Sequence, residues 1–297
     1  SGCKLQAGVT VITASQSNRQ LILRQEPFSI DDPNPPATTW SVPLSFAPLT
    51  NLGDVQKTLL AGSQKTMDWP AKLGAPKINL DDVGFYRVVY DPETFAAIVT
   101  ALPRLPAAEQ INLLGDAWAL VSAGRLSSTD YLEIAWALRD NPSDAVWRSI
   151  LSALIEIDIW MLDRPERADF HRWSINLLRP QIERLGWTPK PGEPTADAQL
   201  RSAFVYRLGV FGDQDAIVES QNQVSQYLAD ASSIDGNMRP VVINVVGRYA
   251  NEATYNQLWE RYQKAINTEE KTALLRGMQH ALDPALATRT RELTLGE

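Results

Sequence analysis

The sequence predicts a multi-domain β-then-α protein, in which a small β-sandwich precedes an all-α superhelical domain of HEAT- or armadillo-like helix pairs. Before residue 84, apolar residues alternate as in strands; after it, they recur at helical spacing almost to the last residue. A chain of 297 residues can hold two domains. We place a β-sandwich domain at residues 1–83 and a helical domain at 84–297, with 84–91 as the junction strand.

The β-sandwich prediction depends most on residues 40–46, where Trp40, Val42, Leu44 and Phe46 share one face of a strand. Pro43 cannot donate to a β-ladder, so we expect this strand at a sheet edge or a bulge. Turn-rich stretches separate further short candidates, which is typical of a sandwich. These candidate strands are residues 9–14, 21–25, 55–60 and 77–80.

Helix-start signals recur through the rest of the chain. Asp91 and Asp283 each precede a proline, which is suited to the first helical position. Residues 127–130 resemble a capping box, and Gly124 and Gly186 stand where helices end. The turns are short, apart from the proline-rich crossover at residues 187–194. We expect irregular helix pairs whose tryptophans pack in the core: Trp118, Trp136, Trp147, Trp160, Trp173 and Trp259.

Composition excludes several classes of function. The net charge of −7 argues against a nucleic-acid partner, which would need a basic face. No apolar run approaches the length of a membrane-spanning helix, and no signal peptide is visible. The single cysteine, Cys3, excludes an internal disulfide and is interpreted as an incidental thiol. We expect a soluble protein and favour the cytoplasm over the periplasm or the extracellular space.

The sequence contains no complete catalytic motif. The two histidines, His171 and His280, lie more than a hundred residues apart, and there is no H-E-x-x-H zinc helix. A G-x-S-x-G elbow, a P-loop and a G-x-G-x-x-G turn are also absent. We interpret His171 as a surface or satisfied helix histidine. No catalytic and no metal-binding residue is assigned, and the substrate-lining residues are left unassigned.

Residues 79–92, N-L-D-D-V-G-F-Y-R-V-V-Y-D-P, resemble the junction segment of the aminopeptidase-N-like zinc aminopeptidases, relatives of the puromycin-sensitive and membrane alanyl enzymes. In that family a glycine-aromatic-Tyr-Arg strand leads into the C-terminal helical domain. Further stretches match in order, although Glu26-Pro27 departs from the family form of its strand. These stretches are residues 21–28, 40–43, 116–124, 238–241 and 283–286.

The resemblance implies a function for the parent protein: a zinc-dependent aminopeptidase that releases N-terminal residues from peptides. It implies an upstream catalytic domain of the same polypeptide, and further helices after residue 297. The family's G-x-M-E-N loop and zinc ligands have no counterpart here, so we expect this chain alone to be inactive and to need no cofactor. Its implied role is to cap the active-site chamber and help limit substrate length.

The resemblance also suggests where functional contacts lie. Arg87 and Tyr90 are interpreted as residues that tie the two domains together, and His280 precedes a helix start in a loop that could face the chamber. We expect an exposed apolar patch where the catalytic domain docks. The alternative is a non-catalytic helical-repeat scaffold that binds a protein or peptide partner.

Overall fold

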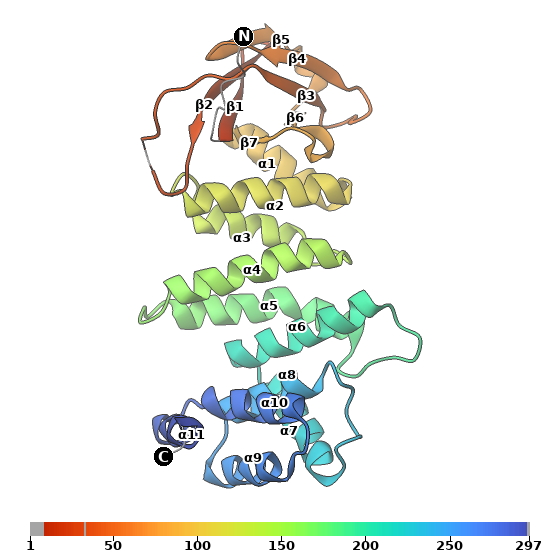
Figure 1. Cartoon of the computed structure of the whole chain (residues 1–297). Helices are drawn as coiled ribbons and strands as arrows, with labels where there is room; N and C mark the ends of the chain where they lie inside the picture. Colours follow the sequence, from red (N-terminus) through yellow and green to blue (C-terminus); the bar gives the residue numbers. More distant parts are fainter. Residues whose placement is uncertain (1–8, 33, 296–297) are drawn as a thin grey trace. The chain divides into compact units, whose positions relative to one another are not determined.

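The computed structural model describes residues 9–32 and 34–295, and Cys3 lies outside these ranges. The chain forms two compact units, Ser1–Ile157 and Asp158–Glu297. Strands come first and eleven described α-helices follow (Figure 1). This order confirms the β-then-α prediction.

Seven described strands form two sheets in the first unit. One sheet has the order β5-β2-β1-β7 and the other the order β4-β3-β6. All the pairs are antiparallel except β1 with β7, which run parallel and place Thr10 opposite Tyr86. The bounds are β1 Val9–Ser17, β2 Gln20–Phe28, β3 Val42–Pro48, β4 Gln56–Leu60, β5 Gln64–Asp68, β6 Pro76–Ile78 and β7 Tyr86–Tyr90.

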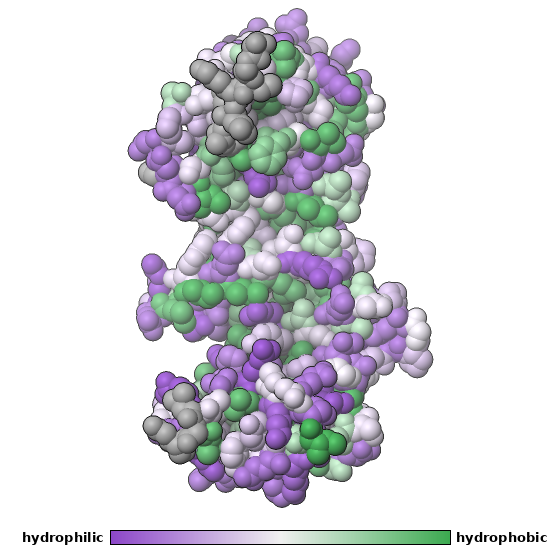
Figure 2. Space-filling model, in the orientation of Figure 1, coloured by the Kyte–Doolittle hydropathy of each residue, from purple (hydrophilic) through white to green (hydrophobic). Residues whose placement is uncertain are grey.

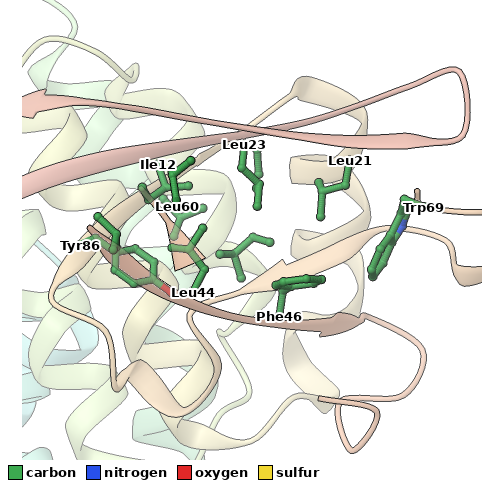
Figure 3. Packing of buried hydrophobic residues seen from close by; sticks show 12 residues of the cluster. Ile12, Leu21, Leu23, Leu44, Phe46, Leu60, Trp69 and Tyr86 are labelled. Carbon is green, nitrogen blue, oxygen red and sulfur yellow. The ribbon is translucent and has the colours of Figure 1, made fainter. Parts of the chain in front are cut away.

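One apolar core joins the facing sides of the two sheets. Leu21 lies near Trp69 at one end of this core, and Ile12 and Leu60 lie near Tyr86 at the other (Figure 3). Alternate residues of each strand point into it, as the period-two pattern requires. On the outside, apolar surface is visible among polar residues (Figure 2), and the exposed large apolar side chains of the strand region are Ile30, Val55, Leu59, Val83 and Phe85.

Two details of the sheets differ from the sequence-based expectations. Strand β3 is central in its sheet and not at an edge. Pro43 is nevertheless tolerated, because β6 is only three residues long and pairs with β3 from Phe46 onward. Strand β5 was missed, because its sequence QKTMD is mostly polar and no member of it is fully buried.

The helices begin and end where their capping signals stand. Asp91 accepts a hydrogen bond from Thr94 N at 2.8 Å, and Asp283 accepts one from Ala285 N at 2.8 Å. The capping box at Ser127 and Asp130 is present, and Gly124 and Gly186 have positive φ. The helices of the first unit are α1 Pro92–Ala101, α2 Ala107–Ser122, α3 Ser128–Ala137 and the greater part of α4 Asp144–Trp160.

In the second unit, α8 packs against α6, α7 and α10, and α10 also contacts α9 and α11. The proline-rich crossover lies between α5 and α6, as expected. Trp147 is fully buried, but Trp136 and Trp160 are exposed, so the core-packing prediction was wrong for these two. The helices are α5 Arg167–Leu185, α6 Thr195–Phe211, α7 Gln214–Ala229, α8 Arg239–Arg248, α9 Glu252–Lys264, α10 Thr268–Gln279 and α11 Pro284–Leu295.

A buried polar network joins the end of the sheets to α2. Lys77 Nζ lies 2.6 Å from Glu109 Oε2 and donates to Asn112 Oδ1 at 2.9 Å. Asp116 accepts from Arg87 Nη1 at 3.1 Å and from Val88 N at 3.0 Å. The junction strand β7 is therefore held on one side by β1 and on the other by α2. The division at residues 83 and 84 stays a prediction.

Between residues 9 and 295, apart from the undescribed position 33, no helix has the length and apolar composition that crossing a membrane requires. The compartment stays a prediction.

Candidate peptide-binding pocket between α8 and α10

Helices α8 and α10 approach each other so closely that their backbones touch near their C-terminal ends. A Cβ placed on Gly247 would lie 2.2 Å from the Gly277 carbonyl oxygen, and one on Gly277 would lie 2.8 Å from Ile243 O. Only glycine permits this distance. The sequence pattern gave no sign of the contact, because the two glycines lie in separate helices.

Toward the N-terminal ends of the two helices, a pocket of about 330 Å³ lies between them. Both helices contribute polar residues, among them Arg239 and Asn244 from α8, and Thr272 and Arg276 from α10. Gly236, Pro240, Thr268, Glu269, Glu270 and Ala273 complete the lining. The pocket therefore combines two guanidinium groups, an amide, hydroxyl groups and the carboxylates of Glu269 and Glu270.

Two polar atoms in this lining have unused hydrogen-bonding capacity. Arg239 Nε and Asn244 Oδ1 are buried and find no hydrogen-bond partner among the described residues. A buried polar group without a partner costs free energy, and a bound polar ligand can recover that cost. Arg276 is exposed at the edge of the pocket.

Of the two acidic residues in the lining, Glu269 is exposed, and the buried Glu270 is already neutralised. Glu270 accepts hydrogen bonds from Tyr227 and, at 2.7 Å, from Arg261 Nε. Burial opposes ionisation of Glu270, but these hydrogen bonds and the charges of Arg261 and Arg239 outweigh it and hold its pKa below the ordinary value. Burial and the neighbouring Glu270 raise the pKa of Tyr227 to about 12.

The guanidinium of Arg239 lies over the ring of Tyr227, with Cζ 5.8 Å from the ring centroid. Glu270 is engaged by Arg261, whose Nη2 lies 2.6 Å from Glu270 Oε1. Arg239 therefore keeps donor capacity for a ligand. The chemistry of the lining suits a carboxylate or the carbonyl groups of a peptide.

The residues singled out from the sequence lie elsewhere. His171 Nε2 is 2.5 Å from Asp158 Oδ1, and Arg167 Nε donates to the same oxygen at 2.7 Å, so His171 is a satisfied helix histidine. His280 is exposed at the C-terminal end of α10 and is not among the residues that line the pocket. Asp158 could not be recognised from the sequence, because thirteen positions separate it from His171.

The sequence indicated only the α8 side of the pocket. Residues 238–241 were recognised as a helix start, and Arg239 with Pro240 falls within them. Nothing in the sequence indicated that α10 would lie opposite. The pocket residues therefore became visible only once the pairing of α8 with α10 was known.

A family profile described as ERAP1-like C-terminal domain matches residues 76–297. The chain belongs to this family. Because the match begins at β6, it includes the junction network, α8 and α10. The recognition of an aminopeptidase-N-like C-terminal region is confirmed.

Named relatives of this ERAP1-like chain are aminopeptidases. Aminopeptidase 2 of Candida albicans is 24% identical over 251 residues, which cover 83% of this chain and 27% of the relative. Aminopeptidase M1-B of Oryza sativa is 28% identical over 299 residues, covering 94% of this chain and 34% of the relative. The puromycin-sensitive aminopeptidase of Caenorhabditis elegans is 26% identical over 287 residues, 92% of this chain and 29% of the relative. The chain thus spans about a quarter to a third of the length of these relatives.

Proposed function

We propose that this chain is the C-terminal region of a zinc-dependent aminopeptidase, an enzyme that releases N-terminal residues from peptides. The observation that carries this proposal is the match of nearly the whole chain to about one third of aminopeptidases such as that of Oryza sativa. The remaining two thirds of such a protein would supply the catalytic domain, which is the partner of this region. The β-sandwich of residues 1–83 would share its first sheet with the junction strand at 84–91, and the rest of residues 84–297 would form a HEAT-like helical domain.

In this proposal the zinc ion belongs to the catalytic domain. Within residues 9–32 and 34–295, no three side chains of His, Cys, Asp or Glu lie together as a set of metal ligands. These residues do not fit a zinc site, and no catalytic step is assigned to them.

The role of the helical region in this proposal is to cap the active-site chamber and limit substrate length. The pocket between α8 and α10 supports this role. Arg239 and Arg276 can pair with the carboxylate at the far end of a peptide, while Asn244 binds its backbone. A peptide held at both ends is selected by length, since one that is too short cannot reach both sites.

The natural full-length polypeptide that contains this chain tests the proposal. It should contain one zinc ion per molecule and hydrolyse alanyl- and leucyl-p-nitroanilide, but not the N-acetylated compounds. Removal of zinc with a chelator should abolish hydrolysis, and added zinc should restore it. A zinc-free protein without hydrolysis of any unblocked aminoacyl substrate would refute the proposal and favour the scaffold alternative.

A further inference from the structure

The loop that leads into β7 adopts an unfavourable backbone conformation at several positions. Asn79, Asp81 and Asp82 have φ values of 59°, 58° and 54°, in the left-handed region, which Asn and Asp tolerate better than other non-glycine residues. Three such residues within four positions still need support from their surroundings. The conformation of this loop therefore depends on contacts with the residues around it.

Side chains inside the first unit hold this loop in place. Asn79 is buried; its Oδ1 accepts from Gly84 N at 2.7 Å and its Nδ2 donates to Gly84 O at 3.1 Å. Asp81 N donates to Glu109 Oε1 at 2.6 Å, and Asn112 Nδ2 donates to Asp82 Oδ1 at 2.8 Å. The loop is thus fixed at both ends and anchored on α2.

This fixed loop presents two large apolar side chains to solvent. Val83 is 81% exposed and Phe85 is 83% exposed, whereas Leu80 and Tyr86 on either side are buried. Gly84 between them cannot be replaced without a clash, because a Cβ would lie 2.1 Å from Tyr86 Cε1. A rigid loop that exposes apolar groups loses little conformational entropy on binding, which is the property of a preorganised docking contact.

The sheet topology indicates which partner this contact receives. Because β1 and β7 run parallel, with Thr10 opposite Tyr86, the start of β1 lies beside the loop. Val9 and residues 82–87 together line a hollow of about 280 Å³. Any polypeptide that precedes β1 therefore reaches the sheets next to Val83 and Phe85.

We propose that Val83 and Phe85 form a docking contact for the catalytic domain that precedes β1. This inference rests on the proposed function, which assigns that domain to the same polypeptide. The contact would fix the catalytic domain at the loop anchored by Asn79 and α2. It would bury apolar surface that is exposed in the isolated chain.

A site-specific cross-link in the natural full-length polypeptide tests the contact. Phe85→p-benzoylphenylalanine is compared with Leu59→p-benzoylphenylalanine, since Leu59 is a 52% exposed side chain on β4 in the same unit. After irradiation, we expect position 85 to form intramolecular cross-links to the catalytic domain, upstream of residue 1, at least fivefold more than position 59. Equal yields at the two positions, or cross-links mainly between two copies, would overturn the proposal.

A second variant supports the same test without a photoreactive group. Val83→Ser/Phe85→Ser should leave the unfolding midpoint of the isolated chain unchanged, because both side chains already lie in water. In the full-length polypeptide, the double variant should increase several-fold the rate of proteolytic cleavage between the catalytic domain and the region described here. An unchanged cleavage rate would overturn the docking contact.

These results separate the docking contact from the proposed function. Cross-links in a full-length protein that lacks aminopeptidase activity would refute the function and keep the contact. Zinc-dependent activity without enhanced cross-links would refute the contact and keep the function.

Discussion

Lys77 Nζ lies 2.6 Å from Glu109 Oε2, and the two side chains are 0% and 2% exposed. Lys77 belongs to β6 and Glu109 to α2, so this buried ion pair connects a sheet to a helix. Removal of one partner leaves a buried charge without compensation, which costs more than the intact pair contributes.

We expect Lys77→Met to lower the free energy of unfolding by about 3 to 5 kcal/mol. The double variant Lys77→Met/Glu109→Gln should recover part of this loss, because the uncompensated carboxylate is then absent. Urea denaturation of the three proteins measures the difference. A Lys77→Met protein as stable as the parent would show that the pair does not anchor β6.

The neighbouring carboxyl of Asp116 should give the protein a pH-dependent stability. Burial raises the pKa of Asp116 to about 6, although Arg87 and the Val88 N–H favour its ionised form. The folded state thus binds this proton more tightly than the unfolded chain does. Its contribution to stability is present below about pH 4 and is lost as the pH rises through about 6.

Asp116→Asn removes the titration and keeps an oxygen that can accept from Val88 N. The free energy of unfolding of the parent minus that of Asp116→Asn should therefore fall by on the order of 2 to 3 kcal/mol between pH 4 and pH 7. Denaturant unfolding at several pH values gives this difference. A difference that rises with pH would mean that Arg87 dominates over burial.

The close contact between Gly247 and Gly277 predicts that alanine at position 247 lowers the stability of the protein, the opposite of its usual effect in a helix. Alanine normally stabilises a helix interior by about 1 kcal/mol relative to glycine. Gly247→Ala should instead destabilise the protein by about 2 kcal/mol or more, because the new methyl group meets the backbone of Gly277. Thermal unfolding shows whether the substitution raises or lowers the stability of the protein.

Gly115→Ala in α2 is the matched control. A Cβ there meets only Arg87 Nη1, at 3.6 Å, which is ordinary contact. It should therefore be neutral or stabilising. If Gly247→Ala were stabilising as well, α8 and α10 could not lie as close as described.

If the pocket between α8 and α10 binds the carboxylate of a peptide, a substitution in it should raise the KM for peptides and leave the KM for small chromogenic substrates unchanged. In the full-length protein, Arg239→Ala should raise the KM for a peptide with a free carboxyl end about tenfold, the loss of one charge-assisted hydrogen bond. The KM for the amidated peptide and for alanyl-p-nitroanilide should stay unchanged. Arg291→Ala, an exposed arginine on α11, is the control. Equal effects on the free and the amidated peptide would exclude recognition of the carboxylate.

Local signals predicted the elements well, because strand alternation and helix caps depend on neighbouring residues. Asp91, Ser127 and Asp283 cap helices as their sequence context indicates. The polar strand β5 escaped prediction because its pairing with β2, rather than its own composition, makes it a strand.

The pocket and the buried networks could not be predicted, because they join residues that are distant in the sequence. From the sequence alone, Lys77 would be assigned to the surface; only the fold shows that it contacts Glu109 and Asn112 of α2. The sequence identified Arg239 only as part of a helix start, and its place in a pocket follows from the packing of α10 against α8. Asp158 likewise gives no sign, by itself, of its contact with His171.

We propose that this chain is the non-catalytic C-terminal region of a zinc aminopeptidase. The most direct test measures zinc content and leucyl-p-nitroanilide hydrolysis for this chain and for the natural full-length polypeptide, side by side. We expect one zinc ion and chelator-sensitive hydrolysis for the full-length protein, and neither for this chain. Stoichiometric zinc with turnover in this chain alone, or neither property in the full-length protein, would contradict it.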